Sequence, residues 1–265
     1  MKLDLYQVDA FTDQLFRGNP ACVVPLKEWL PDEILLNITK ENAVPETAFF
    51  INRGDHYHLR WFTPEIEMDL CGHATLASAH VIKNYLDFKG DTGDTIIFET
   101  RSGQLKVSIN LNQYTLDFPS RKPLPSQLPA IIKDAISIQP ISVLKSRDYV
   151  LIYDNETAVR NIQINRLVFD QISLSPGGVI VTATGDHCDF VSRFFTSQSS
   201  ILEDPVTGSS HCSLIPFWSE RLDKKEMVAM QVSSRSGILF CADKADRVWI
   251  GGQARTYSIG HFWTE

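Results

Sequence analysis

The feature that most constrains this chain is a pattern that occurs twice, once in each half. Residues 60–63 (Arg-Trp-Phe-Thr) precede a glycine turn at Gly72, and residues 193–196 (Arg-Phe-Phe-Thr) precede a second turn at Gly208. Small residues and then an apolar run follow each glycine. Self-similarity at an offset of about half the 265-residue chain indicates a duplicated unit. The alternative is a coincidence between two generic strand–turn–helix units.

The chain is long enough to form two cores, and one segment is suited to separate them. Four prolines lie between residues 119 and 129, where they interrupt both helices and sheets. The predicted lobes are therefore residues 1–118, to which the C-terminal tail 255–265 can belong, and residues 119–254.

Many short strands and few helices are expected in each half. We expect helices over 31–41 and 74–86, a further helix after Gly208, a loop at 89–94, and strands over the following ranges: 3–11, 21–26, 46–51, 56–62, 95–100, 103–109, 113–118, 141–145, 149–153, 179–184, 188–195, 230–235, 237–242 and 247–254. This pattern predicts an α+β fold of two pseudo-symmetric lobes, each a curved, mostly antiparallel sheet wrapped around a central helix.

Composition excludes several classes of protein. The net charge is −7 without a basic run, which argues against a nucleic-acid partner. No apolar stretch reaches the ~20 residues of a membrane-spanning helix. Acidic residues in the first nine positions argue against a secretory signal, so a cytoplasmic location is expected. The five cysteines form no Cys-x-x-Cys pair, which argues against a disulfide framework or a structural zinc site.

The two glycine turns carry residues suited to proton transfer. A helix that begins at a glycine offers unpaired N–H groups that can hold an anion, such as a substrate carboxylate. Glu46, His73, Asp204 and Ser209 lie in or near these turns, together with Cys71. A carboxylate, an imidazole and backbone amides can move a proton and stabilise an enolate-type intermediate. If the lobes face each other, both turns line one cleft, and burial there would raise the pKa of Glu46 toward neutral.

Each of these residues also has a purely structural interpretation. Glu46 alone is typical of a solvated acid at a strand edge, and Asp204 before a proline is typical of a turn. Cys71 and Cys212 are also compatible with small buried apolar residues. His211 and Cys212 could contribute to a metal site, but no carboxylate or histidine has a spacing that completes it. The sequence therefore predicts no metal.

Four motifs in order resemble the PhzF-like (phenazine biosynthesis) family. Residues 8–12 with 18–21 (Val-Asp-Ala-Phe-Thr and Gly-Asn-Pro-Ala) are similar to the family's opening. Residues 46–49 (Glu-Thr-Ala-Phe) resemble its catalytic glutamate motif, and residues 69–77 its first glycine turn. Residues 203–209 (Glu-Asp-Pro-Val-Thr-Gly-Ser) resemble its second. The resemblance covers nearly the whole chain and implies a diaminopimelate epimerase-like fold and a homodimer.

The resemblance also implies an activity, which is a proton shift between carbons of a small carboxylate without a cofactor. It assigns catalytic roles to Glu46, His73, Asp204 and Ser209. The residues that it implies for substrate binding are Asn19, Gly72, His73, Ala74, Gly208, Ser209 and Ser210.

The sequence departs from the family pattern in two places. The run after the second Gly-Ser is polar here, at residues 210–212, and residues 231–237 replace a Gln-Gly stretch that a Gly-Arg pair follows. Both departures affect the expected wall of the pocket, so the resemblance does not identify the substrate.

Two other functions remain as alternatives. The first is a two-cysteine racemase or epimerase of amino acids, in which Cys71 supplies one of the thiols. The second is a non-catalytic member of the family that binds a metabolite or a protein.

Overall fold

The computed structural model describes residues 1–86, 95–174 and 177–264. The chain divides into two compact units, which are described separately: unit 1 is Met1–Phe118 with Ile250–Glu265, and unit 2 is Pro119–Trp249. The loop expected at 89–94 lies outside the described residues. The C-terminal boundary falls at 249/250 rather than at the expected 254/255. Gly252 packs so tightly on Phe11 that a Cβ there would lie 2.3 Å from the Phe11 ring.

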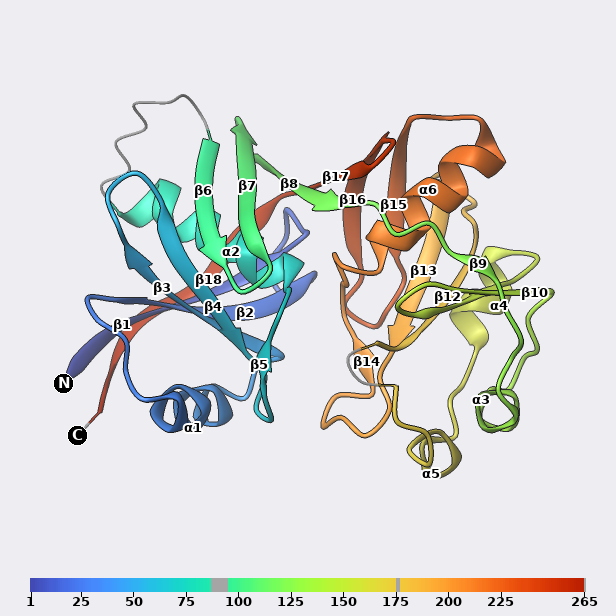
Figure 1. Cartoon of the computed structure of the whole chain (residues 1–265), viewed down its shortest axis with the longest axis horizontal. Helices are drawn as coiled ribbons and strands as arrows, with labels where there is room; N and C mark the ends of the chain where they lie inside the picture. The colour runs from blue at the N-terminus through green and yellow to red at the C-terminus, as the bar shows by residue number, and fades with distance from the viewer. Residues whose placement is uncertain (87–94, 175–176, 265) are drawn as a thin grey trace. The chain divides into compact units, whose positions relative to one another are not determined.

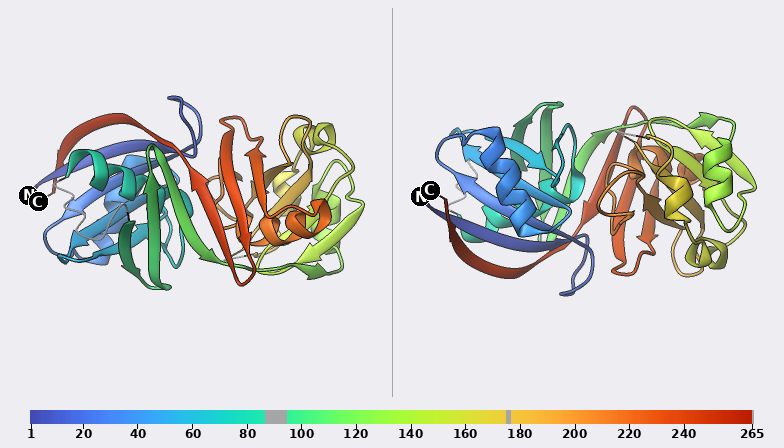
Figure 2. Two further views of the ribbon diagram at one scale, coloured as in Figure 1. Left: turned by 90° about the horizontal axis from the view of Figure 1, so that it is seen from above. Right: turned by 90° about the horizontal axis from the view of Figure 1, so that it is seen from below.

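Unit 1 contains most of the N-terminal elements and the last strand (Figure 1). Its elements are β1 (Lys2–Ala10), β2 (Asn19–Leu26), α1 (Asp32–Asn42), β3 (Glu46–Asn52), β4 (Tyr57–Phe62), β5 (Glu67–Met68), α2 (Gly72–Tyr85), β6 (Thr95–Thr100), β7 (Gly103–Asn110), β8 (Gln113–Pro119) and β18 (Ala254–Trp263). Strand β1 lies between β2 and β18 and is antiparallel to both, and β1 and β18 run side by side in both views of Figure 2. Strands β2 and β3 are parallel, as are β4 and β6.

Helix α2 forms the centre of unit 1. Buried residues run along it from Gly72 to Ile82, so the helix is covered on all sides rather than on one face. Its small alanine and serine side chains allow close packing. Residue Cys71 precedes it with an extended backbone, at φ −139°. The helix therefore begins at the glycine turn, two residues before the expected position 74.

Unit 2 contains the remaining elements. They are β9 (Leu124–Pro125), α3 (Ala130–Ala135), β10 (Ser142–Lys145), β11 (Tyr149–Ile152), α4 (Glu156–Asn161), α5 (Arg166–Phe169), β12 (Val179–Thr184), β13 (Phe190–Phe195), β14 (Glu203–Asp204), α6 (His211–Leu222), β15 (Glu226–Gln231) and β16 (Gly237–Lys244), with β17 (Arg247–Gly252) at the boundary. Strands β11 and β12 are parallel, as are β13 and β15. Helix α6 is buried over most of its length, like α2.

The two units repeat one pairing scheme, which confirms the duplication. In unit 1, Phe62 pairs with Glu67 across β4 and β5. In unit 2, Phe195 pairs with Glu203 across β13 and β14. The order of parallel and antiparallel neighbours around these strands is also the same.

An arginine–glutamate pair braces the turn in each unit. Arg60 donates two hydrogen bonds to Glu67, both of 2.8 Å, and Arg193 donates bonds of 2.7 and 2.9 Å to Glu203. Each guanidinium lies over a phenylalanine ring of its own strand, at 5.0 Å from Phe62 and 4.8 Å from Phe195. The repeated arginine and aromatic residues of the sequence thus build the same brace twice.

Several sequence predictions differ from the structure. The strand expected at 230–235 is β15, which spans Glu226–Gln231, and its residues Met227, Ala229 and Gln231 are buried. Strand β18 was not predicted, and neither were the three short helices α3, α4 and α5. The proline-rich segment 119–129 includes the two-residue strand β9, which pairs with β10. No helix of the described residues is long and apolar enough to cross a membrane.

Candidate functional site

The site in unit 1 forms where three elements begin. Glu46 opens β3 and pairs with Ala21 of the parallel strand β2. Asn19 opens β2, and His73 lies in the first turn of α2. Since β2 and β3 run parallel, their first residues lie at the same edge of the sheet. This arrangement brings residues that are 27 and 54 positions apart in the sequence into one cluster.

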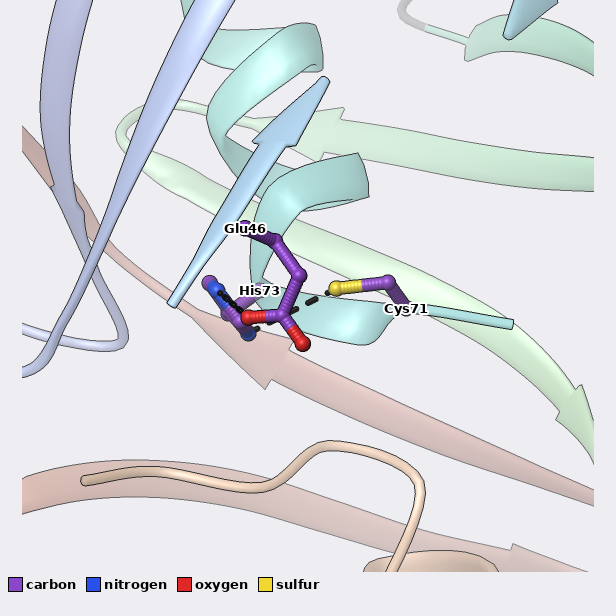
Figure 3. A group of neighbouring side chains, drawn as sticks. All are labelled: Glu46, Cys71 and His73. Atoms are coloured by element: carbon purple, nitrogen blue, oxygen red, sulfur yellow. Dashed lines mark hydrogen bonds and ion pairs between the residues drawn. The ribbon is translucent and has the colours of Figure 1, made fainter. Parts of the chain in front are cut away.

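His73 is the centre of this cluster. Its Nε2 lies 3.1 Å from Oε2 of Glu46 as an ion pair, and its Nδ1 lies 3.6 Å from Sγ of Cys71. The side-chain amide of Asn19 donates to Nδ1 at 3.1 Å. Figure 3 shows the side chains of Glu46, Cys71 and His73 pointing toward one another. Three of the sequence-predicted residues, Asn19, Glu46 and His73, are thus brought together.

Burial and charge act in opposite directions on His73. The side chain is 4% exposed, and burial alone would lower its pKa, but Cys71 and the Glu46 carboxylate outweigh burial and raise the pKa well above the ordinary value. The hydrogen bond from the Asn19 amide has the opposite effect and favours the neutral ring, because Nδ1 can accept it only while that nitrogen carries no proton. Burial raises the pKa of the Cys71 thiol, which favours the protonated sulfur. The Glu46 carboxylate and the His73 imidazole therefore form a pair that can hold a proton, beside the buried sulfur of Cys71.

The same three side chains are the group of donors that could hold a metal. Their donor atoms all lie within 4.8 Å of one another, and carboxylate, thiolate and imidazole are zinc ligands. A single ion would bind one nitrogen of the His73 ring, since Glu46 lies beside Nε2 and Cys71 beside Nδ1. Burial favours the protonated sulfur of Cys71, whereas a metal binds the thiolate, and this weighs against a metal here. His211 and Cys212 lie inside α6 and do not belong to this group.

The site in unit 2 is built on a turn that a buried glutamine holds. Gln231 accepts a hydrogen bond from the backbone N–H of Thr207 at 2.8 Å and donates one to the carbonyl of Asp204 at 2.7 Å. The Thr207 hydroxyl donates to the Asp204 carboxylate. Gln231 therefore fixes the turn that carries Asp204. Sequence reasoning gave Gln231 no role, because its partners lie more than twenty residues away.

Ser209 and Ser210 have different surroundings in this turn. Oγ of Ser209 accepts a hydrogen bond of 3.0 Å from Nη2 of Arg147. Ser210 is 1% exposed, and its hydroxyl donates to the carbonyl of Thr207 at 2.8 Å. Helix α6 begins at His211. The backbone N–H groups of residues 211–213 donate hydrogen bonds to the carbonyls of residues 208–210, three positions earlier, and this pattern is that of a tight 3₁₀ turn at the start of the helix. Gly208, Ser209 and Ser210 thus precede the helix, whereas Gly72, His73 and Ala74 lie within α2.

Known proteins resemble this chain over nearly its whole length. The model of the family "Phenazine biosynthesis-like protein" matches residues 8–260. The chain is 44% identical to an uncharacterized isomerase of Pseudomonas aeruginosa, over 98% of each protein. It is 42% identical to the crystal structure of a phenazine biosynthesis protein of the PhzF family from Enterococcus faecalis, with a TM-score of 0.93 over the whole of both chains.

A more distant structure supports the fold alone. A predicted epimerase from Pseudomonas aeruginosa is 18% identical, with a TM-score of 0.73, and covers 99% of this chain and 100% of that one. Together with the previous matches, it shows that the predicted fold class, a diaminopimelate epimerase-like α+β fold, is confirmed.

Proposed function

The chain belongs to the phenazine biosynthesis-like (PhzF) family, and from this premise we propose that it is a cofactor-independent isomerase of a small carboxylate-bearing metabolite. The reaction moves a proton between two carbons. The observation that carries the proposal is the ion pair between Glu46 and His73. Oε2 of Glu46 and Nε2 of His73 are both buried and make no hydrogen bond with the described residues, so each has hydrogen-bonding capacity left for a ligand atom.

In the proposed reaction, Glu46 is the group that carries the proton. Its carboxylate takes a proton from one carbon as the C–H bond breaks, and the electron pair spreads over the substrate as an enolate-type intermediate. The resulting carboxylic acid then returns the proton to a second carbon, which restores Glu46. Positioned acid–base groups of this kind accelerate proton transfer by about 100- to 10,000-fold.

His73 and the start of α2 stabilise the charges. The His73 ring lies 3.1 Å from the Glu46 carboxylate, so a positive charge on the ring attracts the carboxylate and orients it. The backbone N–H groups of Gly72 and His73 lie in the first turn of the helix, where they have no intrahelical partner. They can therefore donate hydrogen bonds to the developing oxyanion.

We assign a second set of roles to unit 2. Asp204 is proposed as a second acid–base group, and Ser209 with the neighbouring amides at Gly208 is proposed to bind the substrate carboxylate. The hydrogen bonds that hold the turn around Asp204 support these roles. A homodimer and a cytoplasmic location remain predictions.

The two-cysteine racemase is less compatible with the pairing scheme. Trp61 pairs with Met68 in unit 1, as Phe194 pairs with Asp204 in unit 2, so Met68 and Asp204 occupy matching places. Cys71 and Thr207 each lie three residues after these, so Thr207 is the counterpart of Cys71. Cys212 lies one turn further, fully buried, and burial raises its pKa to about 11. The repeat therefore offers one thiol and one hydroxyl at matching places.

Deuterium incorporation tests the proposed function directly. Wild type and Glu46→Gln are incubated in heavy water with a panel of small cyclic and amino carboxylates, and exchange is followed by mass spectrometry. We expect wild type to exchange at least one compound, and Glu46→Gln to lose about 1000-fold or more of that rate, because the amide keeps the shape without the base.

The matched control is Glu41→Gln, which changes an exposed glutamate of α1 in the same way. Exchange in Glu46→Gln at the rate of this control would remove Glu46 from the reaction.

A further inference from the structure

The loop before β11 places an arginine at the candidate site of unit 2. In the shared pairing scheme, Cys22 and Thr47 of unit 1 correspond to Tyr149 and Val179 of unit 2. The counterpart of Asn19 and Pro20 is therefore Ser146 and Arg147. Asn19 contacts His73, the residue after the glycine of the first turn. Arg147 contacts Ser209, the residue at the same place in the second turn.

One side of the Arg147 guanidinium is held in place by the protein. Nε and Nη2 donate to the two carboxylate oxygens of Asp148 at 3.3 and 3.2 Å, and Nη2 also donates to Oγ of Ser209 at 3.0 Å. Asp148 is 1% exposed and itself accepts a bond from the backbone N–H of Gly178. Nη1 makes no hydrogen bond with the described residues, and 17% of the side chain stays exposed. One nitrogen thus remains free for a ligand beside Ser209.

A second guanidinium adds to the positive charge here. The backbone N–H of Arg121 donates to the carbonyl of Cys212 in α6 at 2.8 Å. Nη1 of Arg121 is buried, and it has no hydrogen-bond partner among the described residues. Both arginines act to lower the pKa of the Cys212 thiol, as expected for two positive charges that lie close to it. Buried polar groups without a partner are rare, so an acceptor for this nitrogen is expected.

The two arginines differ in their partners. The Arg147 guanidinium is paired with the Asp148 carboxylate, whereas Nη1 of Arg121 makes no hydrogen bond with the described residues. Unit 1 has no guanidinium at the matching place, because the counterpart of Arg147 there is Pro20. A guanidinium recognises carboxylates better than an ammonium does, through directed hydrogen bonds.

This inference rests on the proposed function. We propose that Arg147 is a substrate-binding residue that selects anionic substrates, with its Nη1 and Oγ of Ser209 binding the substrate carboxylate and Arg121 adding charge. The substrate class is then a small carboxylate rather than its amide or ester. Neither arginine takes part in proton transfer.

The test is calorimetric titration with malonate, and with malonamide as an uncharged isostere, at low ionic strength. We expect wild type to bind malonate at least tenfold more tightly than malonamide. Arg147→Gln should lose at least tenfold in malonate affinity, and Arg147→Lys should retain part of it. Arg166→Gln removes the same charge from an exposed position on α5 and should bind as wild type does.

A second variant separates binding from folding. Arg147→Gln leaves buried Asp148 without its cation, so the double variant Arg147→Gln/Asp148→Asn removes the pair together and keeps the net charge. Loss of malonate binding in this variant, with an unchanged circular dichroism spectrum, supports the proposal. Malonate affinity within twofold of wild type in either variant, or equal binding of malonate and malonamide by wild type, would overturn it.

Glu46→Gln distinguishes this inference from the proposed function. That variant should bind malonate and lose deuterium exchange. If exchange does not depend on Glu46, the proposed function fails while the binding result stands. If malonate binding does not depend on Arg147 while exchange depends on Glu46, only the inference about Arg147 fails.

Discussion

The two glycine turns share a scaffold but differ in the groups that they carry. The arginine–glutamate brace and the strand pairing are the same in both units. At matching places, however, unit 1 has Cys71 and His73 where unit 2 has Thr207 and Ser209. The comparison shows that the repeated residues are those that build the turn. The residues suited to chemistry are the ones that differ.

The place of Glu46 shows this difference most clearly. Its counterpart in unit 2 is Gly178, because Thr47 pairs with Phe62 as Val179 pairs with Phe195. A Cβ on Gly178 would lie 2.6 Å from Cζ of Phe194 and 2.6 Å from the carbonyl oxygen of Phe195. Unit 2 has no room for an acid at this position. Its acid, Asp204, comes instead from the strand before the turn.

The largest expected effect comes from substituting the matching residues His73 and Ser209. His73→Ala should slow Glu46-dependent deuterium exchange by about 1000-fold, because it removes the cation beside the proton carrier. Ser209→Ala should slow it by only about tenfold, the effect of one hydrogen bond on binding. Both variants should keep a melting temperature close to that of wild type. Equal losses in exchange would contradict the proposed division between proton transfer and binding.

Sequence and structure agree where the information is local. The motif at residues 69–75 and the acid at the start of β3 could be recognised because each is contiguous, and the repeat could be found by its fixed offset. Strand β18 escaped prediction because its burial does not alternate regularly, so no face stands out in the sequence. Arg147 and Gln231 also escaped, since strand register alone brings them to residues 209 and 207.

The next largest effect is expected at Gly178. Gly178→Ala should destabilise the protein by about 3 kcal/mol, because its new methyl group meets backbone and a buried ring that cannot move apart without strain. Chemical denaturation followed by fluorescence measures the free energy of unfolding. Gly260→Ala is the control, since a Cβ there meets nothing within 4 Å. Equal stability of the two variants would show that unit 2 has room for a side chain where unit 1 carries Glu46.

The smallest expected effect concerns Thr75 and His211, which again occupy matching places. The Thr75 hydroxyl donates to the carbonyl of Cys71, and Nδ1 of His211 faces the carbonyl of Thr207 at 2.8 Å. Burial lowers the pKa of His211 from 6.5 to about 4. The unfolded chain then binds a proton at a higher pH than the folded protein does, so stability falls as pH decreases from about 6.5 to about 4.

His211→Thr replaces the histidine with the residue that unit 1 uses, and so it should remove this sensitivity. Between pH 7 and pH 4.5, the loss of unfolding free energy should be smaller than in wild type by about 2–3 kcal/mol. Chemical denaturation at both pH values measures it. Part of the acid sensitivity should remain, because burial also lowers the pKa of His80 in unit 1 to about 4. The control is His261→Thr, an exposed position on β18. A pH dependence in His211→Thr equal to that of this control would mean that His211 takes up its proton equally in the folded and unfolded chain. The two units would then differ in this residue without differing in their response to acid.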